Sequence, residues 1–427
     1  MASQADFSNN KKDFKAVESI TWETDLEFLT TLISNLRNCR PNKKFPSEEE
    51  HASKIRRAAV VIVLRFNFGD EAQQSKQKNS NSLGLDEVHK TNLEAMGFTS
   101  PTGNNKRAPE FRISDLIQDV RRYRARLEIL FMKRATHEGD RWSGHVAFPG
   151  GKQDALSDLN DFDTATRECL EEIGLDLKSS ENFLFLGELD DRFITSRFGL
   201  NNLMILSPQI FLQIGKASPA LKLEIKEVAA AGWVPISHVL HFLNQPSSKS
   251  FYHPQQSQKH WFNVDSSVWI DRFSFLGQKK SISQPIGKLM KFLFGGMHFT
   301  AIPLPSPFAP TLLWGVTLNI LSDFVDLGHS PRQIQKVTPL EYPLPAFDLW
   351  PINYIMRWIC RPDPLRKPAT CRPSSTWESY FRTLHWVGSI SLAARFVIVW
   401  LVARFFNSHR FNPSRIFARL TSRKLPA

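Results

Sequence analysis

The feature that most constrains this chain is a set of three glutamates at fixed spacing beside a glycine-rich turn. Glu168, Glu171 and Glu172 stand at i, i+3 and i+4, so a helix would place their carboxylates on one face within about one turn. Three like charges so close together repel, and a helix gains from them only when a cation binds there. Carboxylate oxygens suit a hard ion such as Mg²⁺ or Mn²⁺, and such an ion suits a phosphate-bearing substrate.

The sequence on both sides of these glutamates resembles the signature of the Nudix hydrolase superfamily. The segment 148–152 reads Phe-Pro-Gly-Gly-Lys and supplies Gly151, the glycine that opens the family's motif. Residues 167–175 read Arg-Glu-Cys-Leu-Glu-Glu-Ile-Gly-Leu and supply its second half. An isolated Glu-x-x-Glu-Glu is usually a solvated acidic helix face. Here several residue types recur at fixed spacing after a Pro-Gly-Gly turn, which makes the match specific.

The loop between the two halves of the motif departs from the family's pattern. Arg167 follows Gly151 by 16 positions, which is about two more than the family's usual spacing. Where the family carries a glutamate in this loop, only Asp154 or Asp158 is available to replace it. A lengthened loop with aspartates is similar to the coenzyme A diphosphatase branch of the superfamily.

Residues outside the motif are also similar to the coenzyme A diphosphatase branch. Upstream, a basic lead-in with Arg134 and Arg141 runs into the glycine-rich segment. Downstream, Glu227-Val228 followed by Trp-Val-Pro at 233–235 resembles a later strand of that branch, and 313–317 resembles its closing helix. The resemblance therefore covers residues 57–327, with insertions.

The resemblance implies a role for each residue of the motif. Glu168, Glu171 and Glu172 are the expected metal ligands, and Glu168 and Glu171 are also expected to orient the attacking water. Arg167 is expected to brace the helix and to orient Glu168 through an ion pair. These four residues are the centre of the expected active site.

Residues around the motif complete the expected site. Glu227 or Asp190, each from a later loop, is the candidate general base, although such carboxylates are usually surface groups. Gly151 is expected to adopt a backbone conformation closed to residues with a Cβ atom. The candidate contacts to substrate are Arg134, Arg141, Gly150, Gly151 and Lys152.

Charge is distributed unevenly along the 427 residues. The net charge is +12, and residues 331–427 carry 15 Lys and Arg but only 4 Asp and Glu, so +11 lies in this last part. The part with the motif is nearly neutral, so no nucleic-acid partner is expected, and a basic, aromatic tail fits a membrane surface better. Four scattered cysteines without metal-type spacing indicate an intracellular protein, and the N-terminal residues contain no secretory signal.

Composition and patterning divide the chain into parts. The expected parts are a polar segment with an amphipathic helix (1–56), a main domain (57–328) with insertions near 68–110 and 245–291, a Pro-rich basic linker (331–385), an apolar helix (386–406) and a basic tail (407–427). Within the main domain, apolar and alternating runs predict strands at 58–66, 126–133, 183–189, 203–214 and 297–304, and a helix at 311–327. Periodicity gives only mixed α and β structure, whereas the resemblance implies a Nudix-type α/β/α sandwich with a mixed sheet.

Two helices are expected outside the motif. From Trp22 to Leu36, apolar residues recur at helical spacing, and Thr24 with Glu27 offers a capping box. We expect this helix to pack on the main domain rather than to bind a partner. Residues 386–403 are apolar apart from two serines and Arg395. Three interpretations of that run stay open: a helix that spans a bilayer, a helix in its interface, and a buried core helix.

The sequence predicts a Mg²⁺- or Mn²⁺-dependent Nudix diphosphatase that acts on a nucleoside diphosphate derivative, with coenzyme A or its derivatives as the favoured substrate. One alternative keeps the fold and changes the substrate to a nucleotide sugar, a dinucleotide or a damaged nucleotide. Another is an inactive Nudix domain that serves as a membrane-tethered binding module. The complete set of glutamates argues against inactivity, because an inactive domain has no need of a repulsive triad. We expect an intracellular protein held to a membrane by its tail, in an oligomeric state that the sequence does not specify.

Overall fold

The computed structural model describes residues 21–38, 40–45, 55–69, 109–137, 143–195, 202–215, 218–243, 260–265, 296–329, 344–345, 393, 397 and 400–404. The chain divides into two compact units. The first comprises Met1–Ala346 with Pro362–Ser374, and the second comprises Phe347–Arg361 with Ser375–Ala427. The described strands all belong to the first unit, and the helical residues 400–404 belong to the second.

The first unit is built around a mixed sheet with β1 (Arg56–Asn67) at its centre. On one side β1 pairs antiparallel with β2 (Arg126–Arg134), and on the other it pairs parallel with β7 (Asn202–Gln213). The outer strands are β3 (Val146–Ala147), β4 (Gly150–Lys152), β5 (Phe183–Glu188), β6 (Arg192–Thr195) and β8 (Val228–Pro235). The mixed sheet is confirmed, and the apolar runs that predicted its long strands lie at its centre.

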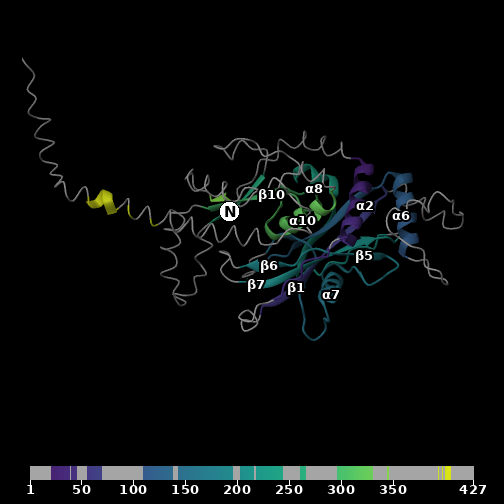
Figure 1. Cartoon of the computed structure of the whole chain (residues 1–427), viewed down its shortest axis with the longest axis horizontal. Coiled ribbons are helices and arrows are strands. Elements are labelled where there is room, and N and C mark those ends of the chain that lie inside the picture. The colour runs from purple at the N-terminus through teal and green to yellow at the C-terminus, as the bar shows by residue number, and fades with distance from the viewer. Residues whose placement is uncertain are drawn as a thin grey trace, which may run out of the picture. The chain divides into compact units, whose positions relative to one another are not determined.

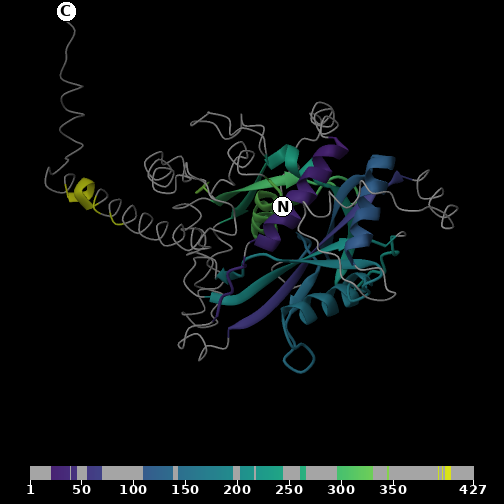
Figure 2. The ribbon, with the colours of Figure 1, turned by 45° about the vertical axis from the view of Figure 1, so that its right-hand side comes forward.

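Helices cover both faces of this sheet, because β1 has an apolar side chain on each face (Figures 1 and 2). Residues Ala59, Val61 and Val63 face α7 (Asp161–Ile173). Their neighbours Ile62 and Leu64 face the larger core. The helices on that second face are α2 (Trp22–Asn38), α6 (Pro109–Tyr123), α8 (Ile236–Leu243) and α10 (Gly315–Leu327). Alternation along one buried strand thus separates the layer that carries the site from the layer that completes the core.

Helix α2 is part of the core of the first unit. Its residues Phe28, Leu29 and Leu32 are buried, and the Phe28 ring lies 5.5 Å from that of Phe324 in α10. The expected capping box at Thr24 is wrong. The helix begins one turn earlier at Trp22, and the N–H of Asp25 donates to the carbonyl of Thr21.

The structure also contains elements that the sequence did not predict. Helix α6 (Pro109–Tyr123) follows the first insertion and buries an apolar stripe of Ile113, Leu116 and Val120. A second, four-stranded sheet joins β10 (Gly296–Pro303), the strand predicted at 297–304, to three strands that were not predicted: β9 (His260–Asp265), β11 (Leu312–Trp314) and β12 (Leu344–Pro345). Strand β9 comes from the second insertion, and β6 begins two residues after Asp190.

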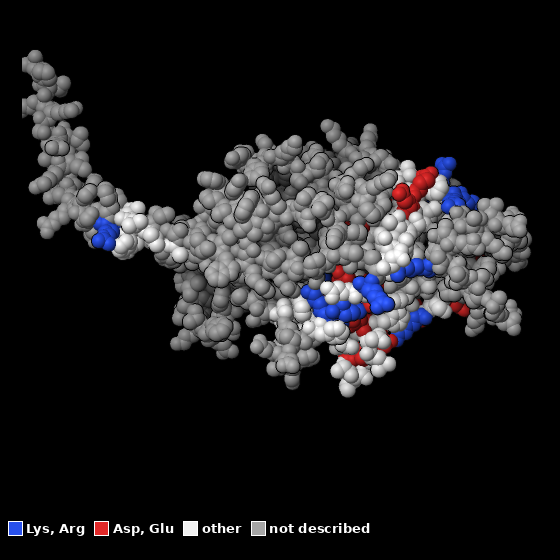
Figure 3. All heavy atoms as spheres, viewed as in Figure 1, with Lys and Arg blue, Asp and Glu red and all other residues white. Residues whose placement is uncertain are grey.

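Acidic and basic side chains of the described residues lie beside one another in the middle of the face shown in Figure 3. This arrangement agrees with a main domain whose charge is nearly balanced, since +11 of the net +12 lies beyond residue 330. Charges of opposite sign that adjoin in this way attract one another locally, and the field that they produce at a distance is small.

In the second unit, only Ala393, Val397 and Trp400–Arg404 of the expected apolar helix are described. They are helical and exposed, and the Arg404 guanidinium lies 5.1 Å from the centre of the Trp400 ring. The remainder of 386–406, most of the linker and the whole basic tail lie outside the described residues. Among the helices that are described, none combines the length and the apolar character needed to cross a bilayer.

Replacing Leu32 with alanine tests the place of α2 in the core. The Leu32 side chain is fully buried, so the variant should lose about 2–5 kcal/mol of unfolding free energy through lost burial and a residual cavity. Thr24→Ala is the matched control in the same helix, because Thr24 is exposed and not a cap. Denaturant unfolding of both variants measures the effect, and a Thr24→Ala variant as destabilised as Leu32→Ala would contradict this placement.

Candidate active site

Helix α7 is terminated by local signals at both ends. The side chain of Asn160 accepts a hydrogen bond from the N–H of Asp163 at 2.9 Å, so Asn160 is the N-cap. Asp161 and Asp163 are equally favoured as caps by residue type, but both lie inside the helix. At the other end Gly174 has φ 73°, and its N–H donates to the carbonyl of Leu170. The helix therefore ends two residues after the last of its glutamates, at the glycine that the motif predicts.

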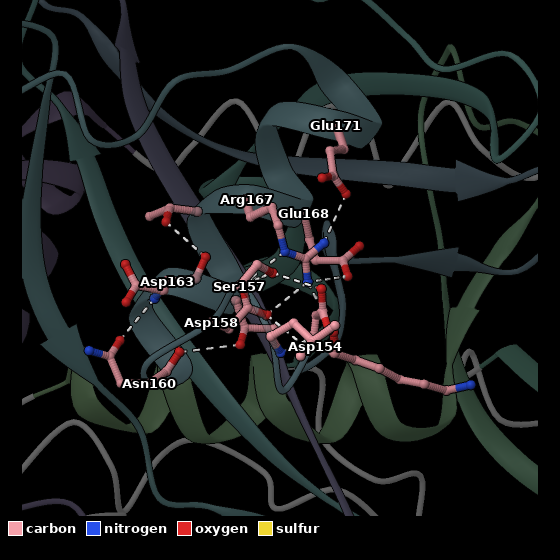
Figure 4. A network of polar contacts seen from close by, with 12 residues as sticks. Asp154, Ser157, Asp158, Asn160, Asp163, Arg167, Glu168 and Glu171 are labelled. Carbon is pink, nitrogen blue, oxygen red and sulfur yellow. Dashed lines mark hydrogen bonds and ion pairs between the residues drawn. The ribbon is translucent and has the colours of Figure 1, made fainter.

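Arg167 lies at the centre of the polar contacts of the site (Figure 4). Its Nε and Nη2 donate to the two carboxylate oxygens of Asp158, each at 2.9 Å. Its Nη1 donates to Glu171 at 2.9 Å, and Nη2 also donates to Glu168 at 3.0 Å and to the carbonyl of Lys152 at 3.1 Å. Hydrogen bonding to Asp158 raises the pKa of Arg167 well above its ordinary value. The ion pair with Glu168 that the resemblance implies is thus one of three.

The two aspartates of the lengthened loop are engaged within the loop and with Arg167. Hydrogen bonds from Arg167 hold the pKa of Asp158 well below its ordinary value, and Asp158 also accepts from the N–H of Asp154 at 2.9 Å. The carboxylate of Asp154 accepts from the N–H of Leu156 at 3.1 Å and from the hydroxyl of Ser157 at 2.9 Å. Asp158 therefore acts as the anchor of Arg167, and Asp154 closes the turn of the loop.

Glu172 is the most enclosed of the three glutamates, with 2% of its surface exposed. One of its oxygens accepts a hydrogen bond from the N–H of Gly150 at 2.8 Å. The pKa of Glu172 is raised to about 8: burial is the largest cause, the negative charges of Glu168 and Glu227 add to it, and Gly150 and Arg134 oppose the shift. The ionised form of this carboxylate is therefore short of nearby positive charge.

Glu168 lies against the backbone of the glycine turn. Burial raises its pKa, Arg167 opposes the shift, and the charges of Glu171 and Glu227 reinforce it. A Cβ atom on Gly151 would lie only 2.4 Å from the carboxyl carbon of Glu168. Glycine is therefore required at 151 by this close approach. The special backbone conformation expected at Gly151 belongs instead to Gly150, whose φ is 143°.

The structure separates the two candidate bases. The charge of Glu227 acts on the pKa values of both Glu168 and Glu172, so this side chain lies close to them. Its carbonyl accepts from the N–H of Ala135, just beyond β2. Asp190 instead accepts from the N–H of Asn42 at 2.8 Å and belongs to a cluster near the N-terminal segment. Only Glu227 remains a candidate base on these grounds.

The candidate contacts to substrate have different placements. Arg134 ends β2, and its charge lowers the pKa of Glu172, which places it beside the glutamates. Lys152 ends β4 with an exposed side chain, and its carbonyl accepts from Arg167. Arg141 lies outside the described residues. The glycine turn and Arg134 therefore adjoin the glutamates, while Lys152 lies at the rim.

The chemistry of these groups fits a hard divalent cation. The candidate ligands are carboxylates, and two of them have raised pKa values that a nearby cation would lower. Within the part of the chain that the structure describes, no three Asp, Glu, His or Cys side chains are arranged to hold a metal ion. The contacts give the reason: Arg167 holds Glu168 and the 57% exposed Glu171, whereas Glu172 turns to Gly150.

A family comparison agrees with this geometry. Residues 118–254 match the NUDIX domain model. The matched range contains α7, the glycine turn, Arg134 and Glu227. The chain contains a Nudix domain. Its mixed sheet with helices on both faces is the fold of that domain, although β1, α2 and α10 lie outside the matched residues.

Individual relatives match parts of the chain. An uncharacterized protein of Schizosaccharomyces pombe is 43% identical over 238 residues, which cover 53% of this chain and 63% of that protein. A peroxisomal coenzyme A diphosphatase of Caenorhabditis elegans is 31% identical over 125 residues, which cover 29% of this chain and 48% of that protein. In both matches the chain spans less than two thirds of the relative. A solved MutT/nudix family protein from Enterococcus faecalis aligns at 14% identity with a TM-score of 0.25, covering 45% of this chain and 46% of that one.

Substituting the glutamates of the Nudix domain one at a time tests their role. Glu171→Gln and Glu172→Gln should each reduce turnover by more than the roughly 10–100-fold that loss of an outer-shell partner costs. Unfolding free energy should change little, because glutamine keeps the shape of the side chain, Glu172 is largely uncharged near pH 7, and the ion pair of the exposed Glu171 with Arg167 is weak. Initial rates at saturating metal and thermal unfolding give the two readouts. Glu181→Gln is the matched control, because Glu181 is exposed. Near-normal turnover of both site variants would show that α7 does not carry the metal site.

Proposed function

We propose that the Nudix domain hydrolyses a diphosphate linkage in a nucleoside diphosphate derivative with the aid of a divalent metal ion, Mg²⁺ or Mn²⁺. The observation that supports this most is that the buried Glu172 and the partly buried Glu168 both have raised pKa values, which mark a place that lacks positive charge. A divalent ion supplies that charge, and in doing so it can polarise a phosphate and activate water.

The side chains of the site divide the remaining tasks among themselves. Glu168, Glu171 and Glu172 would hold the ion through carboxylate oxygens. Arg167 fixes the orientation of Glu168 and joins α7 to its loop. Glu227 is the proposed base that takes a proton from the attacking water at its carboxylate. Arg134, at the end of β2, is the proposed contact to a phosphate oxygen of the substrate.

Coenzyme A or one of its derivatives is the proposed substrate. The lead-in to the glycine turn resembles the coenzyme A diphosphatase branch, and one relative with 31% identity over part of the chain is a peroxisomal coenzyme A diphosphatase. Cleavage of the diphosphate of coenzyme A gives a 3′,5′-phosphorylated adenosine and a phosphopantetheine. The same fold would also accept nucleotide sugars, dinucleotides or damaged nucleotides if its substrate contacts differ from that branch.

A substrate panel decides among these possibilities. The full-length protein with Mg²⁺ or Mn²⁺ should cleave coenzyme A faster than a nucleotide sugar or a dinucleotide, because the basic lead-in suits the additional phosphate. Mass analysis of the products identifies the cleaved bond. Faster turnover of another diphosphate would show that the substrate belongs to that class instead. Absence of turnover with every member of the panel would favour the inactive binding module.

We also propose that the C-terminal region holds the protein to an intracellular membrane. The composition of the C-terminal region supports this proposal. Residues 331–427 carry +11 of the net charge and contain the apolar run 386–403. Basic residues near an anionic surface contribute about 1 kcal/mol each. Of the described residues in the run, Val397 and Trp400–Val402 are exposed apolar side chains, as required for contact with lipid.

Deleting residues 331–427 should release the protein from membranes and leave hydrolysis intact. The elements α7 and α10 and the residue Glu227 all precede the cut, and of the described strands only the two-residue edge strand β12 is removed. Fractionation of cells that express each form measures the release. For the full-length protein, washing with alkaline carbonate separates the two membrane interpretations, since only a spanning helix resists it. Recovery of the unwashed full-length protein wholly in the soluble fraction would rule out both.

A further inference from the structure

A cluster of five charged side chains lies at the N-terminal end of α7, away from the glutamates of the site. The guanidinium of Arg57, at the start of β1, donates to both oxygens of Asp161, at 3.0 and 2.6 Å, and to Asp191 at 3.0 Å. The ammonium of Lys43 lies 2.5 Å from a carboxylate oxygen of Glu188, 3.5 Å from Asp161 and 3.6 Å from Asp191. These five residues are called the clamp below.

The clamp also ties down the backbone of residues 42–44. The N–H of Lys44 donates to Asp191 at 3.1 Å, and the carbonyl of Lys44 accepts from Arg57 at 3.0 Å. The carbonyl of Asn42 accepts from the N–H of Asp191 at 3.0 Å. A segment that follows α2 is therefore joined to β1, to the start of α7 and to the turn between β5 and β6.

Two carboxylates of the clamp are buried or nearly so, and this strengthens the contacts that they make. The Asp191 side chain is fully buried and that of Asp161 is 13% exposed. Removing one cation would leave the three carboxylates of the clamp facing a single positive charge, which costs more than breaking an exposed pair. Arg57 also presents two parallel donors to Asp161, and this fork fixes an orientation as well as a distance.

Helix α7 is thus held at its two ends by different parts of the chain. At its C-terminal end, the N–H groups of Lys222 and Glu224 donate to the carbonyls of Ile173 and Glu172, each at 2.9 Å. At its N-terminal end the clamp fixes Asp161 to β1. The same strand pairs with the glycine turn, Val60 opposite Gly150. The clamp therefore sets the position of α7 relative to the glycines against which its glutamates pack.

We propose that Arg57 and Lys43 are positioning residues for the metal-binding face of α7, although both lie outside the residues 118–254 that match the NUDIX model. The proposal rests on the proposed function, in that it takes the glutamates of α7 as the metal ligands. Metal ligands need a tightly fixed geometry, and Glu168 has no spare room against Gly151. A helix free to tilt at its N-terminal end would bind the ion more weakly.

The test uses the full-length protein and the variants Arg57→Met, Arg57→Lys and Lys43→Met. Calorimetric titration with Mn²⁺ in the absence of substrate should show affinity reduced by about 10–100-fold in both methionine variants, the range for residues that support metal ligands. Arg57→Lys should recover part of the loss. With substrate present, kcat should fall while KM changes little, because the clamp acts on the metal ligands and neither Arg57 nor Lys43 is a proposed contact to substrate.

Lys178→Met is the matched control. Lys178 pairs with Asp163 at 2.8 Å in the first turn of the same helix, but its side chain is 55% exposed. This variant should bind Mn²⁺ like the unaltered protein. If Arg57→Met does not fold, as judged by its circular dichroism, Lys43→Met decides the question.

Unchanged Mn²⁺ affinity in the folded clamp variants, or an equal loss in Lys178→Met, would overturn the proposal. A protein that binds Mn²⁺ but cleaves no diphosphate would refute the proposed function alone, and the Mn²⁺ titrations would still decide the role of the clamp. A protein that binds no Mn²⁺ would refute both.

Discussion

The contacts of Arg167 are the interaction on which the geometry of the site depends. One guanidinium joins the loop at Asp158, the helix at Glu168 and Glu171, and the end of β4 at Lys152. Because the guanidinium is planar, its donors fix these partners relative to one another. The same contacts leave a deficit of positive charge deeper in the site, since Arg167 faces Glu168 and not Glu172. Positive charge is therefore lacking at Glu172 because Arg167 is engaged by Asp158, Glu168 and Glu171.

The sequence predicted those elements whose signals are local. The run around Val61 and Ile62 specified a central strand, and the spacing that ends at Gly174 specified α7. Helix α6 was missed because its apolar stripe, starting at Ile113, follows a long polar insertion that obscures it. The cap at Asn160 was missed because Asp161 and Asp163 are equally good cap residues by type. Where several residues satisfy the same local rule, only packing chooses among them.

Proximity between distant residues was beyond the reach of the sequence. Glu227 and Asp190 had equal standing as bases, because both are carboxylates in later loops, and only the tertiary structure places one of them beside Glu172. The clamp was not foreseen for the same reason, since Lys43 and Glu188 meet across 145 positions. The short motif thus predicts the fold of a Nudix domain. The contacts that hold α7 in place come from segments outside the motif, and the motif does not predict them.

The pairing of β1 has a consequence for how this protein is made. Residues 56–64 pair in parallel with 204–212, and α2 donates a hydrogen bond from Asn35 to the carbonyl of Leu327. A ribosome thus releases the apolar, buried strand β1 well before its parallel partner β7, and α2 well before α10. An uncharged β-branched run such as 58–64 self-associates readily while it is exposed. We expect the nascent chain to depend on chaperones over this interval, and messages cut short before α10 to yield aggregates rather than smaller active domains.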